Sequence, residues 1–123
     1  MARRVVIEIN FNNYGIVPDR LKPAWIRNRI AIFRRYTLRS LRRQTNPDFL
    51  AVLKLADESE PLLNGPLRPF WEDFPPNILF GSERTCVEAI RKFASGHDEL
   101  FVARLDSDDL YRRTFVQLLM DWK

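Results

Sequence analysis

The sequence predicts an α/β fold in which a mostly parallel sheet of about four strands is covered by helices on both faces. Segments with strand and helix character alternate along the chain, and the strand segments are continuous apolar runs, which is typical of strands buried on both sides. The chain has 123 residues, of which 46% are apolar and 29% charged. This length and composition suit one folded domain spanning residues 1–123 and are too small for two.

The first half of the chain contains two expected strands and one long helix. Residues 5–11 form a short β-rich run that ends at Asn12-Asn13-Tyr14-Gly15. From residue 25 to about 43, apolar positions recur at three- and four-residue spacing, which predicts an amphipathic helix stopped by Thr45-Asn46-Pro47. Residues 49–55 are the second expected strand.

The second half begins with residues 61–76, which hold five of the eight prolines and are expected to be an irregular insertion. A brief third strand follows at residues 77–80. Ser82 can cap a helix that runs to about residue 94 and stops at Gly96. The fourth strand is expected over residues 100–105. A last helix over about 112–122 is expected to bury four apolar side chains: Phe115, Leu118, Leu119 and Trp122.

Several classes of protein are excluded by simple counts. The longest uncharged stretch is the ten residues 9–18, too short for a membrane span, and the start of the chain lacks the apolar run of a signal peptide. We therefore expect a cytoplasmic, or membrane-peripheral, protein. One cysteine, Cys86, and one histidine, His97, argue against a disulfide framework, a zinc site or a Ser-His-Asp relay. The four glycines form no nucleotide-binding glycine loop.

Polar residues follow three of the four expected strands. They are Asn10 and Asn12, Asp57 and Glu58, and the cluster Asp106 to Asp109. Ligands of parallel sheets bind at the carboxyl ends of the strands, so we expect these groups to converge on one edge.

The acidic cluster is the most informative of the three groups. Arg104, Asp106 and Asp108 occupy alternate positions and would share one face of an extended strand, at roughly 6.6 Å between neighbours. Two carboxylates this close repel each other unless a cation lies between them, and Mg²⁺ or Mn²⁺ is the natural choice. Asp109 is better placed to cap the turn into the last helix. The alternative is that the whole cluster is a solvated turn and helix cap.

The order of these elements resembles a nucleotide-sugar glycosyltransferase of the GT-A fold, and more narrowly the bacterial rhamnosyltransferase-like family. The resembling segments span nearly the whole chain. They are Phe11-Asn12, Trp25-x-x-x-Arg29-x-x-x-Phe33-x-x-x-Thr37-Leu38-x-Ser40-Leu41-x-x-Gln44, Phe49 and Arg104-Leu105-Asp106-Ser107-Asp108-Asp109.

The resemblance implies a Rossmann-like three-layer sandwich that binds a nucleotide-diphosphate sugar donor with Mn²⁺ or Mg²⁺. Asp57 matches the acidic residue directed at the base or ribose of the donor. Asp106 matches the member of the D-x-D motif near the ribose, and Asp108 the member that binds the metal. Asn10 departs from the arginine expected before Phe-Asn. A GT-A enzyme is also longer, so the chain is expected to be a truncated, donor-binding half without the acceptor site and catalytic base, and its acceptor stays unidentified.

The sixteen arginines against four lysines contribute to a net charge of +4 and leave other interpretations open. Arginine suits phosphate ligands, but genome composition alone can produce the same bias. The arginine-rich helix 26–43 could make the chain a basic nucleic-acid-binding module, although the charges spread around the helix and we do not expect nucleic acid as the partner. Arg104 could pair with Asp106 or reach the donor pyrophosphate, and Arg84 could meet a phosphate. The remaining alternative is an inactive fragment without a ligand.

Overall fold

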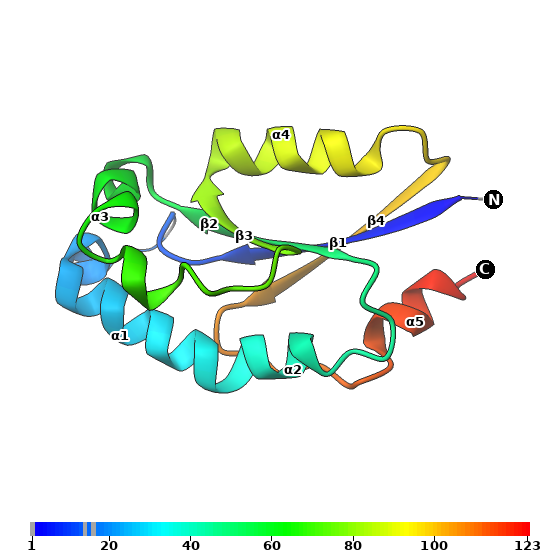
Figure 1. Ribbon diagram of the computed structural model, residues 1–123, viewed down its shortest axis with the longest axis horizontal. Coiled ribbons are helices and arrows are strands. Elements are labelled where there is room, and N and C mark those ends of the chain that lie inside the picture. Colours follow the sequence, from blue (N-terminus) through cyan, green and yellow to red (C-terminus); the bar gives the residue numbers. More distant parts are fainter. Residues whose placement is uncertain (1, 14, 16) are drawn as a thin grey trace.

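The computed structural model describes residues 2–13, 15 and 17–123, and its centre is one four-stranded parallel sheet (Figure 1). The strand order is β3-β2-β1-β4. The strands are β1 (Arg3–Asn10), β2 (Leu50–Leu55), β3 (Ile78–Ser82) and β4 (Glu99–Asp106). This confirms the predicted α/β, Rossmann-like sandwich. Tyr14, at the expected end of the first strand, lies outside the described residues.

Helices cover the two faces of the sheet unequally. The helix predicted at residues 25–43 is α1 (Pro23–Phe33), a π-helical segment (Arg34–Leu38) and α2 (Arg39–Arg42) in direct succession. It lies on one face, whereas α4 (Glu83–Ala94) lies alone on the other (Figure 1). The remaining helices are α3 (Glu60–Asn64) and α5 (Phe115–Met120). No helix of the described residues is long and apolar enough to cross a membrane.

Side chains of alternate strand positions divide into two cores. On β1, Val5, Ile7 and Ile9 point into the larger core, which also receives Ile26, Ile30 and Phe33 of α1. A smaller core beneath α4 contains Val6, Val52 and Cys86. Every residue of β2 is buried because β2 lies between two other strands and between the two helical layers. The sheet is therefore held rigidly at its centre, which positions the carboxyl ends of the strands.

The start of α4 agrees with the sequence pattern. The hydroxyl of Ser82 accepts a hydrogen bond from the backbone N–H of Thr85 at 3.4 Å, as a helix cap does. Gly96, predicted to stop this helix, has a φ of +80°, a conformation that glycine adopts without strain.

The predictions for the fourth strand and the last helix need correction. β4 is an edge strand and is covered on one face only, so Leu100 and Val102 are partly exposed instead of buried. The single helix α4 is too narrow to cover all four strands. The last helix begins only at Phe115, and it buries Val116 completely, while Leu118 and Trp122 are more than half exposed.

The proline-rich segment 61–76 is more ordered than predicted. It continues α3 and contains a 3-10 turn at Arg68–Phe70. Leu63 and Leu67 are buried in the larger core, and the indole N–H of Trp71 donates to the carbonyl oxygen of Leu63 at 2.7 Å. The apolar residues of this segment thus cover the larger core next to the edge strand β3.

Candidate functional site

The carboxyl ends of β1 and β4 meet at a hollow with a volume of about 420 Å³. Asn10 and Asp106 are direct neighbours in the register of these two strands, and both line the hollow. Asp108 lines it from the turn after β4, and Trp25 and Arg29 line it from α1. The predicted strand-end convergence therefore holds for Asn10, Asp106 and Asp108.

Three carboxylates gather at this edge. One oxygen each from Asp106, Asp108 and Asp109 can be chosen so that all lie within 4.8 Å of one another. Arg104 and Asp106 are exposed while Leu105 is half-buried, in agreement with the predicted alternation along the strand. Asp108 is exposed and Ser107 buried, but both lie in the turn after β4 and not on the extended strand. An octahedral Mg²⁺ or Mn²⁺ ion with metal–oxygen distances near 2.1 Å needs ligand oxygens roughly 3 to 4.2 Å apart, so these carboxylates could hold such an ion after small side-chain movements.

Asp109 differs from the other two aspartates because it is already engaged. Its Oδ2 accepts a hydrogen bond from the backbone N–H of Asp106 at 3.0 Å, and its own N–H donates to the carbonyl oxygen of Asp106 at 3.2 Å. Asp109 therefore closes the turn that follows β4. The prediction that Asp109 caps the last helix is therefore wrong, because that helix begins six residues later, at Phe115.

Two arginines that sequence reasoning did not select border the same hollow. The Nη2 of Arg29 donates to the hydroxyl of Ser107 at 2.7 Å, and Arg20 lines the hollow from the turn before α1. The signal for Arg29 was present: it lies at four-residue spacing between Trp25 and Phe33, inside the stripe that faces the sheet. For Arg20 we find no comparable signal in the sequence.

The other predicted site residues lie elsewhere or have other partners. Asp57 is exposed in a neighbouring hollow of about 210 Å³, which shares Arg20 with the first. Arg104 points to Glu8, with 3.5 Å between Nε and Oε1, and not to Asp106. Arg84 is exposed on the first turn of α4 and lines neither hollow.

Asn12 is completely buried and acts within the protein. Its Nδ2 donates to the carbonyl oxygen of Arg20 at 3.1 Å and to the hydroxyl of Ser59 at 2.8 Å. Its Oδ1 accepts from the backbone N–H of Ala56 at 2.9 Å. Asn12 thus ties the end of β1 to the loop after β2 and to the turn that carries Arg20, and it positions both hollows.

The segment that follows the aspartates is fastened to the long helix by three buried polar side chains. The hydroxyl of Thr37 lies 3.0 Å and 2.5 Å from the carbonyl oxygens of Ser107 and Asp109. The hydroxyl of Ser40 accepts from the N–H of Tyr111 at 3.2 Å. Gln44 donates to the carbonyl oxygen of Arg112 at 2.6 Å and accepts from the N–H of Val116 at 3.0 Å. We call Thr37, Ser40 and Gln44 the helix clamp.

The clamp leads to a testable expectation for Gln44. Replacing Gln44 with Met keeps the length of the side chain but leaves the carbonyl oxygen of Arg112 and the N–H of Val116 without their partner. Because an unpaired buried polar group is costly, we expect the free energy of unfolding to fall by about 2 kcal/mol in chemical denaturation. The exposed neighbour Arg42, replaced with Met, serves as the control and should change it by less than about 0.5 kcal/mol. Equal free energies of unfolding for the two variants would contradict the stabilising role of Gln44 in the helix clamp.

The fold places the chain among α/β domains with a parallel sheet, and the hollow lies at the carboxyl ends of the strands, where ligands of such sheets commonly bind. A family model described as putative rhamnosyl transferase matches residues 18–121. The chain therefore belongs to this family, and a transferase of the glycosyltransferase type is the function that the family name carries. The matched residues include the helix clamp, Arg29 and the aspartate cluster. Comparison with curated proteins and with solved structures gave no match.

Proposed function

We propose that this domain binds a nucleotide-diphosphate sugar, as the donor of a glycosyltransferase reaction, in the hollow between Asp106, Asp108 and Arg29. The observation that carries the proposal is the pairing of opposite charges around one hollow. Two exposed carboxylates, Asp106 and Asp108, line it together with Arg20 and Arg29, and the hydrogen bond to Ser107 holds Arg29 next to the aspartates. A metal–diphosphate complex has the complementary arrangement of cation and anion.

In this proposal Asp106 and Asp108 hold Mn²⁺ or Mg²⁺. The ion, when bound, neutralises the charge that develops on the leaving diphosphate and so acts as a Lewis acid. Arg29 is held by Ser107 and can direct its remaining N–H groups at phosphate oxygens. Trp25 supplies an apolar wall. Asp57, in the neighbouring hollow beyond Arg20, is proposed to contact the ribose or base of the donor.

Isothermal titration calorimetry with UDP and dTDP tests this proposal directly. We expect binding in the presence of Mn²⁺ or Mg²⁺ and an affinity at least tenfold lower in EDTA, because the aspartates repel the diphosphate unless a cation lies between them. Binding of equal affinity in EDTA would overturn the role of the metal. The absence of binding under both conditions would favour the inactive-fragment alternative.

A further inference from the structure

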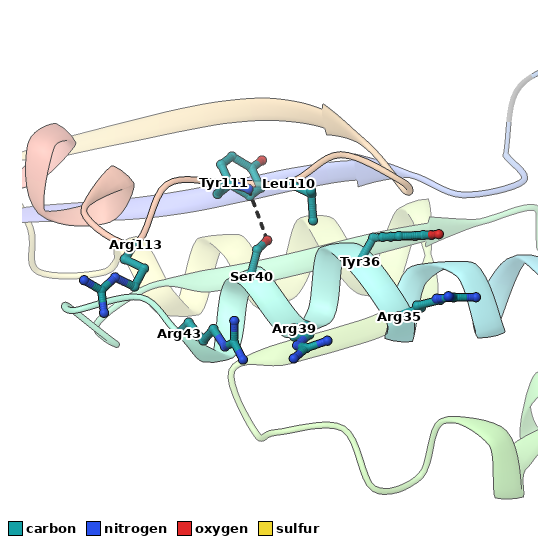
Figure 2. A pocket seen from close by; sticks show the side chains of 8 residues that line it. All are labelled: Arg35, Tyr36, Arg39, Ser40, Arg43, Leu110, Tyr111 and Arg113. Carbon is teal, nitrogen blue, oxygen red and sulfur yellow. Dashed lines mark hydrogen bonds between the residues drawn. The ribbon is translucent and has the colours of Figure 1, made fainter.

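A second and larger hollow, of about 600 Å³, lies between the π-helical segment and α2 on one side and residues 110–113 on the other (Figure 2). Arg35, Arg39 and Arg43 line it from successive turns of the helix, and Arg113 lines it from the opposite segment. The N–H of Tyr111 donates to Ser40 across the hollow, which fastens the two sides together. The hollow is therefore a built feature of the fold, and it begins two residues after Asp108.

The charge of this hollow is uncompensated. None of its lining residues is acidic. Within residues 2–13, 15 and 17–123, no carboxylate lies within ion-pairing distance of these four arginines. Four guanidinium groups without a counter-ion around one concavity favour an anion with several oxygens.

Three other arginines of the same helix, Arg27, Arg29 and Arg34, have partners elsewhere, which separates this hollow from a general basic stripe. Arg34 pairs with Asp73 through two hydrogen bonds of 2.7 Å, which lower the pKa of the Asp73 carboxyl to about 2. Arg29 binds Ser107, and Arg27 lies over the ring of Phe70 at 6.0 Å. Within the described part of the chain Arg42 also has no ion pair, but it lies outside the hollow. Because four unpaired charges gather at one concave site, they suit a small ligand better than an extended nucleic acid.

The hollow also has an apolar wall. Leu110 is 67% exposed and Tyr36 is 40% exposed, and both line it. The guanidinium of Arg35 lies 5.6 Å from the centre of the Tyr36 ring. An exposed leucine and a tyrosine ring beside four cations would suit a ligand with two chemical parts, one anionic and one hydrocarbon.

We propose that this hollow binds a phosphate- or diphosphate-bearing molecule with an apolar substituent, independently of divalent metal. The anionic group contacts Arg39, Arg43 and Arg113, and the apolar substituent packs against Leu110 and Tyr36. The site is separate from the proposed donor hollow, whose anion requires a metal on the aspartates. The two sites therefore differ in their response to EDTA.

Calorimetry in EDTA with inorganic pyrophosphate and with geranyl diphosphate tests the proposal. We expect both to bind, and geranyl diphosphate to bind at least tenfold more tightly because of its hydrocarbon chain. The double variant Arg39→Gln/Arg43→Gln should lose at least tenfold in affinity for both probes. Leu110→Ser should reduce only the preference for geranyl diphosphate. The matched control Arg27→Gln/Arg42→Gln removes two charges from the same helix outside the hollow and should leave both affinities unchanged.

Three outcomes would overturn the proposal. They are the absence of pyrophosphate and geranyl diphosphate binding in EDTA, an equal loss in the control variant, and binding of an RNA oligonucleotide by the same four arginines in place of both probes. Failure here is distinguishable from failure of the donor site. Arg39→Gln/Arg43→Gln should keep the affinity for UDP with Mn²⁺, whereas Arg29→Gln and Asp108→Asn should keep the affinity for pyrophosphate in EDTA.

Discussion

Replacing Asp108 with Asn is expected to lower the metal-dependent affinity for UDP at least tenfold, which corresponds to about 1.4 kcal/mol. Asp108 is exposed, lines the donor hollow and lies close to Asp106 and Asp109. Asparagine keeps the size of the side chain but removes the charge that attracts the cation. The unfolding free energy of the metal-free protein should stay the same or rise, because the repulsion among the three carboxylates decreases.

Asp109→Ala is the matched comparison and should give the opposite result. Its carboxylate accepts the N–H of Asp106, so its removal should lower the free energy of unfolding by roughly 1 kcal/mol. UDP binding in Mn²⁺ should be largely kept. Titration calorimetry of both variants measures the UDP affinity, and chemical denaturation measures the free energy of unfolding. Loss of metal-linked binding in Asp109→Ala together with its survival in Asp108→Asn would mean that the metal ligand is assigned to the wrong aspartate.

The largest expected effect on stability comes from Lys54, which is buried on β2. Its Nζ lies 2.8 Å from Oε1 of Glu8 and 3.2 Å from Oε1 of Glu83. Lys54→Met fills the space but leaves Glu8 nearly buried without this cation, so we expect unfolding to become easier by about 3 kcal/mol. As a control, Lys22→Met removes an exposed ion pair with Asp19 and should cost less than about 0.5 kcal/mol. Denaturation midpoints that coincide for the two variants would refute a stabilising role for Lys54.

The same ion pair predicts a pH dependence with a definite sign. Burial alone would lower the pKa of Lys54, but hydrogen bonds to Glu8 and Glu83 outweigh it, and the pKa lies above its ordinary value of 10.5. The native state therefore holds this proton more tightly than the unfolded state. The resulting stabilisation is complete below pH 10.5 and is lost as the pH rises through the raised pKa. When the wild-type protein and Lys54→Met are denatured at increasing pH above 10.5, the difference between their free energies of unfolding should become smaller.

Local patterns in the sequence were sufficient to predict the parallel α/β fold and one half of the candidate site. The apolar run of β2 predicts burial on both faces because alternate side chains of a strand point to opposite sides. The same alternation predicts that Arg104, Asp106 and Asp108 face together. The convergence of Asn10 with Asp106 follows from the rule that parallel strands end at one edge. These properties depend on near neighbours in the chain, and they can be inferred without knowing the packing.

The other half of the candidate site depends on contacts between segments that are distant in the sequence. Arg29 lies beside the aspartates because α1 crosses the sheet at that edge, and its partner Ser107 is 78 residues away. Arg39 and Arg113 line one hollow because Ser40 and Gln44 fasten residues 111–116 to the helix. Whether Leu100 and Leu118 are covered depends on the width of α4 and the place where α5 begins. A periodicity shows which side of an element is apolar, but only the packed structure determines which element, or which ligand, that side meets.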